Sequence, residues 1–168
     1  MTEYERTQIG HVIIWCLFVP AVLFAINATV GSSPHRESLL VVSVVLLITL
    51  ALFYKLTVTI NKETLRASFG IGMIRKRVSI AEIVACEPIR IRWWYGWGIH
   101  LTPYGWLYNV SGLDAVAITL RNGKKFALGT DDPQGLAAAI GDAINKRRYQ
   151  PLRMKAAQQR RTPRRGRR

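Results

Sequence analysis

The chain has 168 residues, of which 49% are hydrophobic, and it is strongly basic, with a formal net charge of +14 at pH 7. Its two cysteines, Cys16 and Cys86, lie far apart in the sequence. This excludes a small disulfide-stabilised domain and a cysteine-ligated zinc module, so we expect neither a metal nor another cofactor. The apolar residues concentrate in two long runs in the first third of the chain, which indicates a membrane protein.

The first apolar run covers residues 9–26 and the second covers residues 39–56. Each has roughly 18 residues, and at ~1.5 Å per residue a helix of this length spans ~27 Å, close to the ~30 Å hydrocarbon core. Between them, residues 27–38 include Gly31 and Pro34 and read as an external loop. Pro20 falls within the first run and is expected to kink the first helix, with the second helix and nearby hydroxyl groups satisfying the carbonyl that it leaves unpaired.

The basic residues predict the orientation of this helical hairpin. Only Arg6 and Arg36 precede Lys55, and every other Lys and Arg follows it. Because Lys and Arg stay on the cytoplasmic side, we expect both termini, including residues 1–8, to be cytoplasmic in a multi-pass inner-membrane protein. A cleaved signal peptide is the disfavoured alternative, because residues 1–8 carry two glutamates and the apolar run exceeds the usual ~7 to 15 residues.

After the second run the pattern changes to short segments in which apolar and polar residues alternate, as in β-strands. The strand candidates are residues 56–60, 65–69, 73–80, 83–94, 98–101, 106–110, 115–121 and 124–128. Asn122 and Gly123 separate the last two and favour a type I′ hairpin, because both residue types tolerate a positive φ.

A helix should follow the strands. Residues 130–132 are capping types, Pro133 suits a first helical turn, and Leu136, Ile140 and Ile144 form one apolar stripe at a spacing of four. This stripe predicts packing of the helix on the sheet. Residues 57–145 therefore form an α+β soluble domain, large enough for one modest core.

The soluble part resembles bacterial membrane proteins in which a transmembrane hairpin precedes a pleckstrin-homology-like (PH-like) domain. The resemblance covers residues 55–145 and rests on the strand order, the segment 98–112, the hairpin at Asn122 and Gly123, and the helix start at 129–133. It implies a bent antiparallel sheet or barrel capped by a C-terminal helix, which serves as a binding or scaffolding module. In relatives that bind lipid, a basic loop between early strands contacts the head group, and Arg75, Lys76 and Arg77 lie near a comparable place.

An aromatic cluster follows two arginines in the middle of the domain, with Tyr95, Tyr104, Trp106 and Tyr108 among its rings. Three explanations compete: core packing, a belt at the membrane interface, or a surface that stacks on a ligand or nucleic acid. The candidate residues for binding anionic lipid or a protein partner are Arg75, Lys76, Arg77, Arg90, Arg92, Trp93, Trp94 and Trp97.

The C-terminal segment 146–168 is rich in Lys and Arg and lacks Asp and Glu, so we expect a basic disordered tail. Its charge serves solubility and topology, binds anionic lipid, or binds a polyanion such as nucleic acid or the ribosome. The candidate polyanion-binding residues are Arg147, Arg148, Arg160, Arg161, Arg164, Arg165, Arg167 and Arg168.

An enzyme is the least supported class of function. The three histidines, His11, His35 and His100, are scattered, and none adjoins a nucleophile with an orienting partner. Asp131 and Asp132 are better explained as helix caps than as a catalytic pair, so we expect no catalytic residues. The expected function is a membrane-anchored cytoplasmic module that binds anionic lipid or a protein, and the alternative is a membrane tether for a polyanion.

Overall fold

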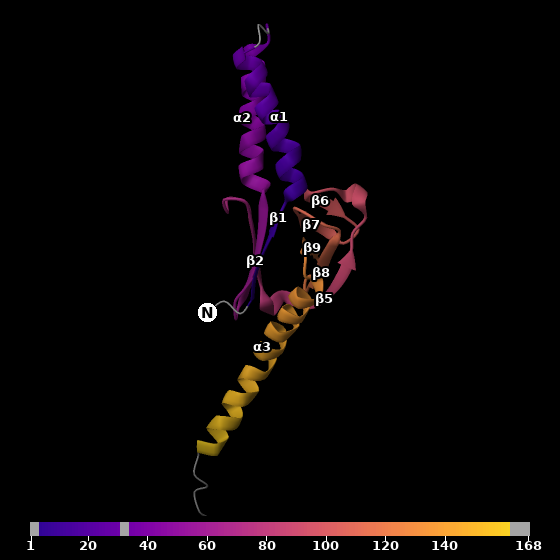
Figure 1. Ribbon diagram of the computed structural model, residues 1–168. Helices are drawn as coiled ribbons and strands as arrows, with labels where there is room; N and C mark the ends of the chain where they lie inside the picture. The colour runs from indigo at the N-terminus through magenta and orange to yellow at the C-terminus, as the bar shows by residue number, and fades with distance from the viewer. Residues whose placement is uncertain (1–3, 31–33, 162–168) are drawn as a thin grey trace, which may run out of the picture.

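The computed structural model describes residues 4–30 and 34–161, with side chains described as far as Tyr149. Two apolar helices extend from one end of a sheet-rich domain, and a third helix extends from the other end (Figure 1). The helices are α1 (His11–Val30), α2 (Arg36–Phe53) and α3 (Pro133–Arg161). The arrangement is the expected α+β class with a C-terminal helix.

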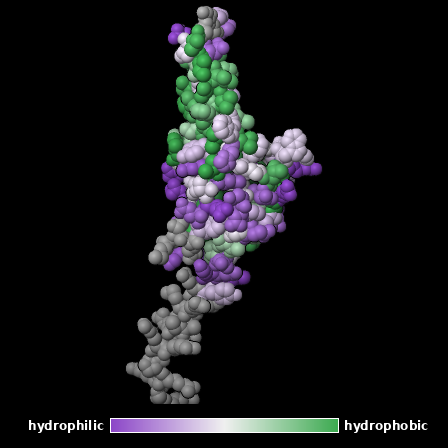
Figure 2. Space-filling view, viewed as in Figure 1, coloured by the Kyte–Doolittle hydropathy of each residue, from purple (hydrophilic) through white to green (hydrophobic). Residues whose placement is uncertain are grey.

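Helices α1 and α2 are both long and apolar enough to cross a membrane, as the sequence predicted. They pack against each other through small residues, since Ala21, Ala28 and Ser43 are buried whereas most of their large apolar side chains are exposed (Figure 2). The Ser43 hydroxyl donates to the carbonyl oxygen of Ala21 at 2.7 Å, one residue beyond Pro20. Small residues and an interhelical hydrogen bond are typical of helix contacts in lipid.

The first sheet is an antiparallel meander of four strands in the order β1-β2-β3-β4. Its strands are β1 (Tyr4–Ile9), β2 (Lys55–Ile60), β3 (Thr64–Phe69) and β4 (Arg75–Ser79). Strand β1 pairs with β2 along its whole length, from Tyr4 opposite Ile60 to Ile9 opposite Lys55. The two apolar helices are therefore an insertion between two neighbouring strands of the sheet.

No strand is expected from the sequence of residues 1–8, and this expectation is wrong. Strand β1 lies at the edge of its sheet and is largely polar, with only Gln8 fully buried. An edge strand of this kind is stabilised by backbone pairing with its neighbour, and it lacks the alternating apolar residues by which a strand is recognised in a sequence.

The second sheet has the order β5-β8-β9-β7-β6. Its strands are β5 (Ile83–Arg90), β6 (Gly98–Thr102), β7 (Gly105–Asn109), β8 (Asp114–Leu120) and β9 (Lys125–Gly129). Strands β7 and β9 run parallel, with Trp106 opposite Phe126. The expected single antiparallel sheet or barrel is thus corrected, because the described residues form two sheets, one parallel pair and no closed barrel. Alternation predicts strands, but it does not determine which strands become neighbours.

The turn between β8 and β9 also differs from expectation. A type I′ turn needs a positive φ at both central residues, yet among the described residues only glycines have a positive φ. The Gly123 amide donates to Leu120 O and the Leu120 amide donates to Lys124 O, each at 2.9 Å, and Gly123 has a φ of 80°. This is a three-residue loop with a left-handed glycine at its end, the next most common hairpin connection.

Helix α3 packs on the core through the predicted stripe, because Leu136 and Ile140 are buried and Ile144 is partly buried. Asp132 caps it by accepting the Gly135 amide at 2.9 Å. The helix continues to Arg161, beyond residue 145, where the sequence analysis ended the domain and expected disorder. The residues that follow are mostly Lys, Arg, Ala and Gln, which have high helix propensity.

Candidate membrane interface and an arginine-lined hollow

The sheets continue directly from the two apolar helices, with no linker on either side. Strand β1 ends at Ile9 and α1 begins at His11, while α2 ends at Phe53 and β2 begins at Lys55. The Gly10 amide closes the junction by donating to Tyr54 O at 2.8 Å. One end of the domain is consequently held at the base of the helices, and we call it the proximal end (Figure 1).

Four tryptophans of the second sheet and its connections are exposed, and we call this set the tryptophan rim: Trp93, Trp94, Trp97 and Trp106. Their exposed fractions are 73%, 53%, 40% and 51%. Trp93 and Trp94 lie in a single 3-10 turn, Trp93–Tyr95, between β5 and β6. Soluble proteins rarely expose several large aromatic rings, so we expect this surface to contact a partner or a membrane.

The tyrosines of the same cluster behave differently. Tyr108 is half-buried and packs against Phe69 and Phe126, with ring centroids 6.1 Å and 6.5 Å away. Tyr95 and Tyr104 pack against a smaller core around Leu107. The tyrosines of the aromatic cluster therefore pack against the core, whereas its tryptophans are exposed at the surface.

Part of the rim lies beside the apolar helices. Trp97, Ile99 and His100 line a crevice of about 400 Å³ together with Cys16 and Leu17 of α1. Leu17 is six residues into α1, so the crevice extends ~9 Å along the helix axis from its start. Figure 1 likewise draws β6 next to the base of α1. The domain therefore overlaps the first turns of an apolar helix.

Two of the predicted arginines accompany the rim. The guanidinium of Arg92 lies 4.1 Å from the centroid of the Trp94 ring, a cation–π distance, and Arg92 directly precedes the Trp93–Tyr95 turn. Arg90 is exposed at the end of β5, opposite Asp114. The structure thus brings Arg90, Arg92, Trp93 and Trp94 to one edge of the second sheet.

The basic residues of β4 do not form a single patch. Arg75 and Arg77 are exposed on one face, whereas Lys76 points to the other face, 5.6 Å from the centroid of the Phe126 ring. This follows from the period of two along a strand, which places neighbouring side chains on opposite faces. Arg75 lies at the proximal end and donates from Nε to the carbonyl oxygen of Gly72.

Sequence reasoning missed the loop that precedes Arg75. Ile71 and Met73 are 63% and 72% exposed, and the Ile71 amide donates to Ala51 O in the last turns of α2 at 3.3 Å. Two apolar side chains are thereby presented at the base of the helices, on the first sheet. The signal was available, since both follow a glycine in a short turn, but residues 70–72 were left between two strand candidates and Met73 was assigned to the start of the second.

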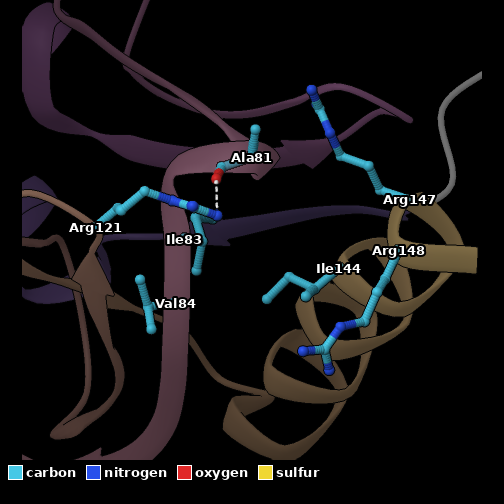
Figure 3. Close-up of a pocket in the computed structure, with 7 residues that line it drawn as sticks. All are labelled: Ala81, Ile83, Val84, Arg121, Ile144, Arg147 and Arg148. Carbon is cyan, nitrogen blue, oxygen red and sulfur yellow. Dashed lines mark hydrogen bonds between the residues drawn. The ribbon is translucent and has the colours of Figure 1, made fainter.

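The opposite end of the domain, which we call the distal end, carries a hollow of about 740 Å³ (Figure 3). Its lining joins the start of β5, the turn after β8 and the exposed side of α3. The lining residues are Ala81, Ile83, Val84, Arg121, Ile144, Arg147 and Arg148. Arg121 donates from Nη2 to the carbonyl oxygen of Ala81 at 3.4 Å. Sequence reasoning named Arg147 and Arg148 as tail residues but missed Arg121.

The remaining predicted tail residues fall into two groups. Arg160 and Arg161 lie at the end of α3, beyond the described side chains, and Arg164, Arg165, Arg167 and Arg168 lie outside the described residues. Figure 1 shows α3 leading away from α1 and α2, so the described part of the tail leads away from the proximal end.

Within the described residues, His, Cys, Asp and Glu form no group of three or more that could hold a metal ion. The chain combines a two-sheet α+β domain with an inserted pair of apolar helices that are long enough to cross a membrane. Comparisons with known protein families, with curated proteins and with solved structures find no match to this chain.

Proposed function

We propose that this protein is a membrane-anchored binding module. In this proposal α1 and α2 cross the inner membrane of a bacterial cell as a hairpin, and the domain, a PH-like module, lies against the cytoplasmic face. The observation that supports it best is the tryptophan rim, whose rings are exposed and whose Trp97 lies beside the first turns of an apolar helix. The first turn of a helix that crosses a membrane lies at the depth of the lipid head groups, where indole rings are favoured.

The surroundings of the rim support contact with anionic lipid. Arg92 lies over the Trp94 ring, Arg90 lies at the end of β5 just before it, and Arg75 lies near the exposed Ile71 and Met73 on the other sheet. A basic residue near an anionic leaflet contributes about 1 kcal/mol of binding free energy. Apolar side chains on two sheets, with cations beside them, match a surface that partly inserts between head groups.

Lipid contact at the proximal end would orient the domain. Two spanning helices already hold the chain in the membrane almost irreversibly, so the rim adds little to attachment. Rim contacts would restrict tilting of the domain, and they would leave the distal end and α3 facing the cytoplasm (Figure 1). The module would then present a partner-binding surface at a constant height above the bilayer.

Fluorescence quenching by brominated lipid tests the position of the rim. We would compare a chain whose sole tryptophan is Trp93 with a chain whose sole tryptophan is introduced at the distal end by Tyr149→Trp, both in nanodiscs. The proposal predicts strong quenching at position 93 and little at position 149. Equal, weak quenching at both positions would exclude insertion of the rim.

A polyanion tether is the alternative, and one observation favours it. Arg147 and Arg148 are exposed on a helix that leads away from the proximal end, where a nucleic acid or a ribosome could reach them. Deleting residues 146–168 discriminates between the two functions. The tether predicts loss of co-sedimentation with ribosomes, whereas the module predicts that Trp93 stays quenched by brominated lipid.

A further inference from the structure

The arginine-lined hollow at the distal end is independent of the proposed lipid contacts, because it lies at the opposite end of the domain from α1 and α2 (Figure 1). Its volume of about 740 Å³ is within the range of ~300–1,000 Å³ that is usual for ligand sites. A leaflet that contacts the tryptophan rim could not reach it, so its occupant comes from the cytoplasmic side in the proposed orientation.

The cations that line the hollow come from two elements that are distant in sequence. Figure 3 shows Arg121 entering from one wall and Arg148 from the other, with the aliphatic side chain of Ile144 between them and that of Val84 beside Arg121. Arg147 points away from the other two. In the part of the chain whose side chains are described, no carboxylate forms an ion pair with these three guanidinium groups.

The hydrogen bond from Arg121 to Ala81 O directs this side chain along the wall of the hollow. A guanidinium has five N–H donors, and this bond uses one of them. Guanidinium groups match carboxylate oxygens in a two-pronged geometry, and a charge-assisted hydrogen bond is about twice as strong as a neutral one. Two such groups on facing walls therefore suit a ligand with more than one acidic group.

A β-bulge adds an aliphatic side chain to the lining of the same hollow. The register of β5 against β8 shifts between Ile83 and Ala85, and Val84, the extra residue, is 60% exposed. Bulges redirect side chains and are common next to functional sites. Because Ile83 beneath it is buried in the core, the bulge adds an apolar contact point without weakening the interior.

We infer that the arginine-lined hollow binds an acidic segment of a protein partner that carries a large aliphatic side chain. The aliphatic side chain would lie on Val84 and Ile144, and flanking carboxylates would meet Arg121 and Arg148. Nucleic acid fits less well, because no aromatic ring lines the hollow and single strands are held by stacking on such rings. A docked segment would couple the anchored domain to a second protein.

Fluorescence anisotropy tests this inference on the full chain in nanodiscs of phosphatidylcholine, whose zero net charge avoids competition from anionic lipid. The probe is a fluorescein-labelled peptide of eight residues that alternates aspartate and leucine. We expect saturable binding, about tenfold tighter than that of octa-aspartate, although octa-aspartate carries twice the charge. Equal or tighter binding of octa-aspartate or of an eight-nucleotide oligothymidylate would overturn the inference, as would no saturable binding of the alternating peptide.

Variants separate the hollow from a general effect of charge. Arg121→Gln and Arg148→Gln should each weaken binding of the alternating peptide by about fivefold. Lys124→Gln is the matched control, since it removes one positive charge three residues from Arg121 and does not line the hollow. An equal loss in the Lys124→Gln variant would contradict a local site.

A further variant tests the aliphatic contact in the hollow. Val84→Ser keeps every charge and changes an exposed side chain, so the fold should be retained. It should weaken the alternating peptide by about threefold and leave octa-aspartate unchanged. An unchanged affinity for the alternating peptide would show that the aliphatic contact does not contribute and would overturn the proposed ligand class.

Discussion

At the scale of the single residue, Gly70 lies where the first sheet meets the end of α2. It has a φ of 47°, and a Cβ at this position would overlap the backbone carbonyl groups of Ala51 and Leu52. We expect Gly70→Ala to lower the free energy of unfolding by about 1–3 kcal/mol, because it combines backbone strain with a steric overlap. Thermal unfolding in detergent would measure the loss. Gly72→Ala is the control, since it has a positive φ but no atom within 4 Å of its Cβ.

Asp131 gives a pH-dependent test at the same scale. Hydrogen bonds from Arg6 Nε and Nη2, each at 3.0 Å, hold the pKa of the Asp131 carboxyl below its ordinary value. Because the pKa of Asp131 is lower in the folded state, the ion pair with Arg6 stabilises the fold at neutral pH. This stabilisation is lost as the pH falls below about 4 and the carboxylate is protonated. Asp131→Asn should therefore unfold at a slightly lower temperature at pH 7, and its difference from the unaltered protein should shrink on acidification. A difference that stays constant down to pH 3 would assign the effect to another contact.

At the scale of the element, the contact between α1 and α2 depends on Ser43. Its buried hydroxyl donates to Ala21 O, next to Pro20, which lies inside α1. Interhelical hydrogen bonds of this kind contribute about 0.6 kcal/mol on average and up to ~1.7 kcal/mol in membranes. Ser43→Ala should weaken helix association by that amount, as measured by steric trapping in bicelles. Thr49→Ala is the control, because the Thr49 hydroxyl bonds to Val45 O within its own helix.

The elements also show how far the sequence could predict this molecule. Strands β2 to β9 were predicted from short apolar segments, which alternate clearly in β2 and β3, and α3 from a stripe that repeats every four residues. Strand β1 was missed because it is polar, and the parallel pairing of β7 with β9 because pairing depends on the whole sheet. Of the candidate site, the residue types of the rim could be predicted from the sequence, but their exposure could not. Arg121 was missed because only folding brings it to α3.

At the scale of the whole molecule, the apolar hairpin interrupts a domain whose first strand lies before it. Strand β1 pairs with β2, Arg6 bonds to Asp131 before α3, and Gln8 Nε2 donates to Ser111 O at 2.8 Å between β7 and β8. One short strand therefore touches both sheets and the start of the C-terminal helix. A fragment that begins at Lys55 would lose these contacts and leave β2 as an unpaired edge, which favours aggregation.

Removing the hairpin without removing β1 should preserve the fold of the domain. The Gly10 amide lies 2.8 Å from Tyr54 O, so a short Asn-Gly turn could join Gly10 to Tyr54 in place of residues 11–53. We expect this shortened chain to unfold cooperatively and to run as a monomer in mild detergent, which covers the tryptophan rim. A chain of residues 54–168 should aggregate under the same conditions. Cooperative unfolding of both chains would show that β1 is dispensable, whereas aggregation of both would show that the sheets depend on the hairpin itself.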